Sequence, residues 1–484
     1  MDNLIPNKMP RTLIFFLFVF SISIIVKSQS FDDTSIYNDF KKHVYILASD
    51  SFAGRESGTI GEEKSALYIA SEFKKYGVKP FVSDTSYYQN FSFYSRMYFG
   101  RKSCLILNEN DTVFLGKHYS YTAYSSCNSA KGELVDLGYG IINEMQSPNL
   151  KGKIAIIKIE IPSDIKGQFA DNGFLLRNRI ESIKSLGAEA IIIIASNYKS
   201  RDSIYAYSKI DPIGIPVLIT TQKSALKIQI EGGKQLSIVS NVDRKKLIAK
   251  NVIGTINNNA KKTIVIGAHY DHLGMGKFGS RDKWGKIHYG ADDNASGTAM
   301  VIELAKYISQ NGNKNFNYIF AAFSAEERGL YGSNYFANSS LFDKENIAYM
   351  INFDMVGRLG CLDNMVLVIG TGSSKEWNRV LNKTKSPDYV VKKLKMGPEF
   401  SDHASFVKKN IPYIYFTTGL HKEYHTPLDT PQSLNYEGMV QIFNHVVRVI
   451  DKTSTIDSFE FRKATICQTI KAYLFFAKEM LFPS

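Results

Sequence analysis

Short apolar runs that alternate with a helical pattern are the feature that most limits how the second half of this chain can fold. The runs are TIVIG, NYIFAAF, YMINF and PYIYF, at residues 263–267, 317–323, 349–353 and 412–416. Each run is bounded by polar or glycine-rich segments, which is typical of strands that are buried on both faces. A helical pattern at residues 296–310 lies between the first two runs. Strands that alternate with helices predict an α/β fold with a mostly parallel, mixed sheet flanked by helices.

Histidine and acidic residues stand where these predicted strands end. They occur in AHYD at 268–271, in SAEE at 324–327, as Asp354 directly after YMINF, and in YHTPLD at 424–429, while GADDN at 290–294 precedes the predicted helix. In open α/β sheets, ligands collect at the carboxyl ends of the strands. Imidazole nitrogen and carboxylate oxygen both bind Zn²⁺, and two metal ions about 3.5–4 Å apart can activate a water and polarise a carbonyl together. The pattern therefore predicts a metal site at this edge of the sheet.

These segments resemble the motifs of the co-catalytic dinuclear zinc aminopeptidase family, whose relatives include glutamate carboxypeptidase II, the glutaminyl cyclases and the transferrin receptor. The family's order of motifs stands here as HYD at 269–271, GADDNASG at 290–297, EE at 326–327, Asp354 in NFDMVG and His425 in YHTPLDT. An upstream stretch at 47–73 is similar to the family's N-terminal part. The resemblance implies the zinc exopeptidase fold.

The resemblance also implies which residues bind the metal. Five side chains would hold two Zn²⁺ ions per chain: His269, Asp293, Glu327, Asp354 and His425. One ion would be held by His269 and Asp354, and the other by Glu327 and His425. Asp293 would bridge the two.

Four further residues receive roles from the same resemblance. Glu326 would be the general base that acts on the attacking water, and Tyr424 would place its phenol near the oxyanion that develops on the scissile carbonyl. Asp271 and Asp429 would accept hydrogen bonds from the far nitrogens of His269 and His425, and so fix their tautomers. The family pattern does not require the nearby histidines His272, His288, His403 and His421, and Asp292 is expected to be structural or to support the ligands.

The middle of the chain reads as a β-rich insert at residues 100–245. Its strand-like runs lie at 153–159, 190–195 and 215–220. Three segments of this insert resemble the sequence of a protease-associated domain, which many members of this family carry at such a position. They are LKGKIAIIKIE, SLGAEAIIIIA and IPVLIT. We therefore expect the insert to interrupt a catalytic domain formed by residues 31–99 and 246–452. The pattern assigns no role to the C-terminal tail at 453–484.

The N-terminus has the features of a secretory signal peptide at residues 1–30. Lys8 and Arg11 precede an apolar run at 13–26, and small residues follow at Ser28 and Ser30. The run of 14 residues is short for a membrane span, which needs roughly 20 residues. The sequence therefore predicts a secreted or periplasmic protein with no membrane anchor after cleavage.

Charge and cysteine content exclude two other classes of protein. The net charge is +13, but the lysines and arginines are scattered and form no long stripe, so we expect no nucleic-acid partner. Four cysteines are too few for a scaffold held by disulfides. Cys104 and Cys127 could pair after export, and the sequence leaves this pairing and the oligomeric state open.

The predicted function is that of a metallo-exopeptidase, an aminopeptidase that acts on the N-termini of peptides or proteins. A carboxypeptidase or dipeptidase with the same site remains an alternative, because these relatives share the catalytic motifs. A glutaminyl cyclase is disfavoured by the full set of ligands for two metals, since those relatives use a single zinc. A non-catalytic, receptor-like binding protein is disfavoured by the intact ligands and the intact Glu326.

Overall fold

The computed structural model of the chain describes residues 32–463, with gaps, and a few isolated positions beyond them. The gaps are 96–97, 100–102, 108–111, 115–118, 143–147, 161–175, 196–210, 232–234, 241, 244, 284, 361–363 and 398. The predicted signal peptide and most of the tail beyond residue 463 lie outside the described residues. Within those residues, no helix combines the length and the apolar character needed to cross a membrane.

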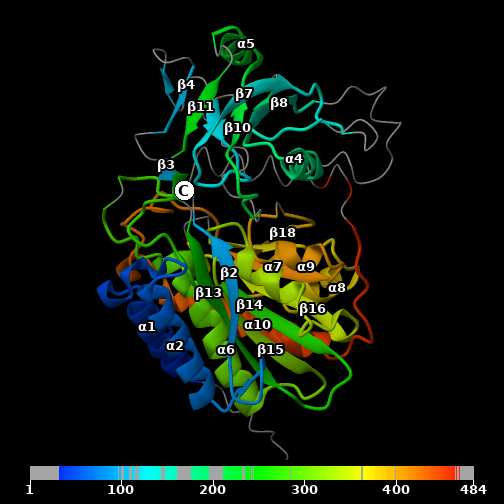
Figure 1. Cartoon of the computed structure of the whole chain (residues 1–484). Coiled ribbons are helices and arrows are strands. Elements are labelled where there is room, and N and C mark those ends of the chain that lie inside the picture. Colours follow the sequence, from blue (N-terminus) through cyan, green and yellow to red (C-terminus); the bar gives the residue numbers. More distant parts are fainter. Residues whose placement is uncertain are drawn as a thin grey trace, which may run out of the picture.

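One sheet contains all four of the predicted strands (Figure 1). They form its parallel centre, in the spatial order β15 (Asn317–Phe323), β14 (Thr263–His269), β16 (Ile347–Phe353) and β19 (Tyr413–Thr417). Antiparallel strands extend one side, namely β13 (Lys246–Ile256) with β1 (Lys79–Pro80) and β2 (Tyr88–Tyr94). On the other side, β17 (Met365–Ile369) pairs with β19 antiparallel and with β18 (Val390–Leu394) parallel. The prediction of a mixed sheet with a parallel centre is confirmed, but four of its eight strand pairings are antiparallel, so the sheet is evenly mixed rather than mostly parallel.

Helices cover both faces of this sheet. The larger apolar cluster packs one face against α1 (Asp33–Leu47), α2 (Ile60–Lys75), α6 (Gly297–Asn311), α8 (Glu376–Lys383) and α10 (Tyr436–Thr453). A second cluster packs the other face against α7 (Tyr331–Ala337) and α9 (His403–Val407). Successive residues of β14 divide between the two clusters, because Ile264 and Ile266 belong to the first and Val265 to the second. This burial on both faces explains why the strand is a continuous apolar run.

A second, eight-stranded sheet lies within the range predicted for the insert. It contains β4 (Cys104–Ile106), β5 (Thr112–Phe114), β6 (Tyr119–Tyr121), β7 (Ala130–Asp136), β8 (Lys153–Lys158), β9 (Ala190–Ile194), β10 (Val217–Thr220) and β11 (Leu236–Val239). Helices α4 (Leu176–Ser185) and α5 (Gln222–Glu231) accompany it (Figure 1). The insert has two apolar clusters of its own. Its assignment as a protease-associated domain stays a prediction.

The beginning of the tail packs against the catalytic domain, although the sequence pattern assigned it no role. The ring of Phe459 lies 4.8 Å from that of Tyr349 and 4.7 Å from that of Trp377. The backbone N–H of Arg462 donates to the carbonyl of Ser373 at 2.8 Å. Phe459 and Ile456 are therefore partly buried against the core of the catalytic domain, whereas Thr455, Asp457, Ser458, Glu460 and Arg462 are exposed. Cys104 and Cys127 are both free thiols, so the pairing left open by the sequence is not formed.

Candidate metal centre

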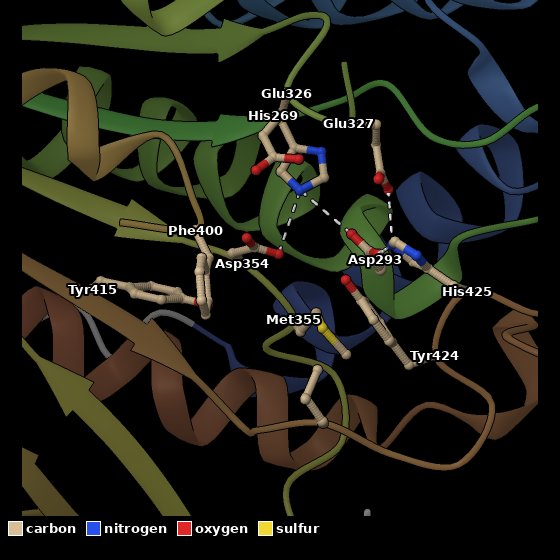
Figure 2. Close-up of a pocket in the computed structure, with 11 residues that line it drawn as sticks. His269, Asp293, Glu326, Glu327, Asp354, Met355, Phe400, Tyr415, Tyr424 and His425 are labelled. Atoms are coloured by element: carbon tan, nitrogen blue, oxygen red, sulfur yellow. Dashed lines mark hydrogen bonds and ion pairs between the residues drawn. The ribbon is translucent and has the colours of Figure 1, made fainter. Parts of the chain in front are cut away.

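The five candidate ligands meet at the carboxyl ends of the central strands (Figure 2). His269 is the last residue of β14, Asp354 directly follows β16, and Glu327 lies in the turn after β15. Asp293 belongs to the short turn η3 (Ala291–Ser296) that leads into α6, and His425 lies in the loop between β19 and α10. The structure therefore brings these strand ends together, as the sequence predicted.

The ligand atoms form two groups that share Asp293. On one side, His269 Nε2 lies 3.4 Å from Asp293 Oδ1 and 3.4 Å from Asp354 Oδ1. On the other side, His425 Nε2 lies 3.1 Å from Asp293 Oδ2 and 3.3 Å from Glu327 Oε1. The two oxygens of one carboxylate thus face two different sets of donors, as a bridging ligand requires.

These separations fit metal coordination. Ligand atoms at about 2.0–2.1 Å from a tetrahedral Zn²⁺ lie about 3.3 Å from one another. The histidine tautomers also fit, because His269 Nδ1 donates to the backbone carbonyl of Asp271 at 3.2 Å and His425 Nδ1 donates to that of Gly279 at 2.9 Å. With its hydrogen on Nδ1, each ring directs the lone pair of Nε2 at the centre.

The electrostatics of the centre favour a positive charge beside Asp293. Burial disfavours a charged His425, yet the neighbouring Glu327 and Asp293 carboxylates raise its pKa to about 11. Burial opposes ionisation of Asp293 as well, but its contacts with His269 and His425 hold its pKa well below the usual range. A divalent cation bound between these groups would supply the positive charge that the carboxylates attract.

Asp271 does not contact His269 in the predicted way. Its Oδ1 lies 3.8 Å from His269 Nδ1, and the ring donates instead to the backbone carbonyl of Asp271. The Asp271 carboxylate accepts hydrogen bonds from the hydroxyl of Ser57 at 2.8 Å and from the backbone N–H of Glu326 at 3.1 Å. Asp271 therefore orients His269 through its backbone and ties the turn of Glu326 to the strand end of His269.

The predicted role of Asp429 is wrong. A glycine carbonyl in the loop that precedes η3, that of Gly279, occupies the position at His425 Nδ1. The Asp429 carboxylate instead accepts the backbone N–H groups of Asp292 and Asp293, each at 3.0 Å. Asp429 thus holds the backbone of the bridging residue rather than the histidine.

Tyr424 lies beside the centre, where the sequence placed it. Its ring stacks on that of His425 with 3.8 Å between centroids, and its hydroxyl points toward Asp293 in Figure 2. Burial, together with the carboxylates of Asp293 and Glu327, raises its pKa well above the usual value. The phenol therefore stays protonated and can donate a hydrogen bond.

The other motif histidines divide between the centre and the surrounding packing. His272 reaches the centre, because its Nδ1 lies 2.9 Å from Glu327 Oε1 and 3.7 Å from Asp293 Oδ2. His288 hydrogen-bonds Ser280 and the carbonyl of Lys286, and His403 stacks between the rings of Tyr413 and Tyr415. His421 contacts Asp292 and Glu423. The family pattern gave no signal for His272 beyond its position three residues after a ligand.

Arg55 is a second residue near the centre that the sequence did not reveal. Its buried guanidinium donates to four backbone carbonyls, those of Leu47, Tyr270, Tyr289 and Gly290. Tyr270 follows the ligand His269, and Gly290 starts the GADDN segment. Arg55 therefore joins two ligand-bearing segments to the turn η1 (Asp50–Arg55) at the N-terminal side.

A cavity of about 150 Å³ opens beside the five candidate ligands. Glu326 and Tyr424 also line it, and its apolar wall is formed by Met355, Phe400, Tyr415 and Leu420. Figure 2 shows Phe400 and Tyr415 on the side of Asp354, opposite Tyr424 and His425. The cavity thus combines a carboxylate-rich floor with an apolar wall.

Comparison with known proteins identifies the catalytic segment. Residues 251–450 match the model of Peptidase family M28. Aminopeptidase YwaD of Bacillus subtilis (strain 168) is 26% identical over 422 residues, which cover 83% of this chain and 82% of that protein. An aminopeptidase of Pseudomonas aeruginosa (strain UCBPP-PA14) is 26% identical over 322 residues, which cover 64% of this chain and 55% of that protein.

A solved structure shares the fold. The aminopeptidase from Aneurinibacillus sp. strain AM-1 aligns with 89% of this chain and 95% of its own, at 23% identity and a TM-score of 0.51. All five candidate ligands lie inside the segment that matches the family model. Residues 251–450 are therefore similar to peptidase family M28, and the chain resembles these aminopeptidases, in one case over 83% of its length.

Proposed function

We propose that this protein is a secreted zinc aminopeptidase that binds two Zn²⁺ ions per chain and removes residues from the free N-termini of peptides. The observation that carries the proposal is the placement of Asp293, whose two oxygens face separate histidine–carboxylate groups. When bound there, zinc would polarise the scissile carbonyl and lower the pKa of the attacking water.

Glu326 performs the proton transfers in this proposal. It lines the cavity but belongs to neither group of candidate ligands. Burial raises its pKa well above the usual value, which suits a carboxylate that takes a proton from water and returns it to the leaving amine. Tyr424, protonated and stacked on His425, is placed to donate to the oxyanion.

The lining of the cavity supports a substrate with a free amino group and an apolar first side chain. Glu326 and Asp354 line the cavity with carboxyl oxygens, which can accept hydrogen bonds from an ammonium group. Among the 11 described residues that line the cavity there is no lysine or arginine, and these are the side chains that bind a terminal carboxylate. The lining therefore favours an aminopeptidase over a carboxypeptidase.

Peptides that differ only at their ends test this polarity. A pentapeptide with leucine first is offered to the purified holoenzyme in three forms: free, N-acetylated and C-amidated. Acetylation should abolish cleavage, because it removes the ammonium group that would donate hydrogen bonds to Glu326 and Asp354, whereas amidation should leave the rate unchanged. A matched peptide with glutamate first should be cleaved with kcat/KM at least roughly tenfold lower, and a zinc chelator should stop both reactions.

Two results would redirect the assignment. Cleavage of the acetylated peptide with loss of cleavage on amidation would identify a carboxypeptidase. Cyclisation of a glutamine-first peptide without hydrolysis would identify a glutaminyl cyclase.

A further inference from the structure

His272 is a buried histidine with one contact to the centre and one unused nitrogen. It lies three residues after His269, at the end of the same chain segment, and its side chain is inaccessible to solvent. Nδ1 lies 2.9 Å from Glu327 Oε1, whereas Nε2 has no hydrogen-bond partner among the described residues. The ring is closely enclosed, because a Cβ at Gly290 would lie 2.5 Å from two of its atoms.

The contact with Glu327 is a hydrogen bond donated by the histidine. An ionised carboxylate only accepts hydrogen bonds, so the hydrogen must sit on His272 Nδ1. The separation of 2.9 Å is that of an N–H···O bond. Ligand pairs in this centre lie 3.1–3.4 Å apart, but His272 Nδ1 is 2.9 Å from one ligand oxygen and 3.7 Å from the other. His272 therefore fits a partner of the ligand better than a further ligand.

We propose that His272 is a positioning residue for the half of the centre formed by Glu327, His425 and the shared Asp293. Its Nδ1–H holds Oε1 of Glu327, the same oxygen that lies 3.3 Å from His425 Nε2. Without this bond the Glu327 side chain regains its rotamers, and the affinity of this half for metal falls. The inference rests on the proposed function, because it concerns the second of the two zinc ions.

Three substitutions at one position separate hydrogen bonding from packing. His272→Asn keeps an amide N–H near the position of Nδ1, His272→Gln places it near Nε2 instead, and His272→Ala removes it. Each full-length holoenzyme is equilibrated against graded zinc buffers, and the zinc content per chain is measured. Urea midpoints of the metal-free proteins show whether each variant folds.

In every variant, the zinc on the side of His269 and Asp354 should be lost at the same free zinc concentration as in the wild type. The second zinc should be lost from His272→Ala and His272→Gln at about 10–100-fold higher free zinc than in the wild type, which is the usual effect of removing a partner of a metal ligand. His272→Asn should retain it to within about threefold of the wild type. If His272→Ala does not fold, the contrast between His272→Asn and His272→Gln decides the same question.

Two outcomes would overturn the inference. One is wild-type retention of both zinc ions by His272→Ala or His272→Gln. The other is a folded His272→Asn that loses the second zinc as readily as His272→Gln, since the retained N–H would then have no effect. A wild-type protein that binds no zinc, or only one, would instead refute the proposed function.

Discussion

Glu326 and Glu327 are neighbours in the chain but lie in different surroundings. Directly before them, Ala325 has a left-handed backbone conformation with φ of 56°, and the chain turns there. Glu327 faces His272 and His425, and although burial opposes its ionisation, these contacts hold its pKa at about 2. Burial raises the pKa of Glu326 well above the usual range, and the charge of Glu327 adds to this effect. At the residue scale, one glutamate is therefore suited to bind a cation and the other to carry a proton.

Replacing each glutamate by glutamine separates these two roles. Glu326→Gln removes the proton acceptor and leaves the ligands in place, so kcat should fall about 10²–10⁴-fold while the chain keeps two zinc ions. Glu327→Gln weakens a ligand, so the chain should retain about one zinc and lose stability together with activity. Metal analysis and steady-state kinetics on both variants measure this difference. Glu345→Gln, at an exposed position in η4 (Lys344–Asn346), is the control and should change neither quantity.

A reversed pattern, with zinc lost from Glu326→Gln and kept by Glu327→Gln, would exchange the two assignments. Full activity in both variants would refute the mechanism itself.

At the scale of elements, the insert joins the catalytic domain through β2 and β13. These strands are antiparallel, with Tyr94 opposite Lys246. The ladder continues beyond them, because the N–H of Ser95 donates to the carbonyl of Lys245 at 2.8 Å and the N–H of Lys245 donates to Ser95 Oγ at 2.9 Å. The two strand ends therefore have the arrangement of a β-hairpin in which a domain replaces the loop.

Replacing residues 96–244 with Asn-Gly should close this hairpin, since that dipeptide forms the turn that two antiparallel strands prefer. All candidate ligands lie outside the deleted range, so the shortened chain should fold and keep two zinc ions. Hydrolysis of a dipeptide amide should persist, while the preference between short and long peptides should change. Zinc content, circular dichroism and kinetics measure these properties, and Asp293→Ala in the shortened chain is the zinc-free control. A folded deletion variant that has lost zinc would show that the insert contributes ligands.

At the scale of the whole molecule, the first helix of the described residues begins close to the end of the predicted signal peptide. Helix α1 starts at Asp33, and the side chain of Asp32 caps it by accepting from the N–H of Thr34 at 3.1 Å. Asn444 on α10 donates to Asp33 at 3.0 Å. Removal of residues 1–30 would therefore leave these contacts in place.

We propose that the chain is exported with cleavage after Ser28 or Ser30, so N-terminal sequencing of the protein from its native host should begin at Gln29 or Phe31. Phe18→Arg places a charge in the apolar run, so this variant should stay unprocessed inside the cell. An active wild-type protein in the cytosol that starts at Met1 would contradict export.

The strands and the types of ligand were predictable from the sequence. The run NYIFAAF became β15 with the expected bounds, and TIVIG became the first five residues of β14. A strand buried on both faces must be apolar at nearly every position, and this requirement leaves a continuous signal in the sequence. The meeting of three candidate ligands, His269, Glu327 and Asp354, was predictable because parallel strands bring their carboxyl ends to one edge.

The partners that hold each ligand were decided by the tertiary structure. His425 was expected to donate to Asp429, four residues away in sequence, but it donates to Gly279, which is 146 positions away. His272 and Arg55 also have partners far away in the sequence. Glu327 lies 55 positions from His272, and Gly290 lies 235 positions from Arg55. Burial acts on every residue of an element and so determines its sequence pattern. A hydrogen bond instead depends on where a distant loop passes, to within a few tenths of an ångström, and no local pattern specifies that path.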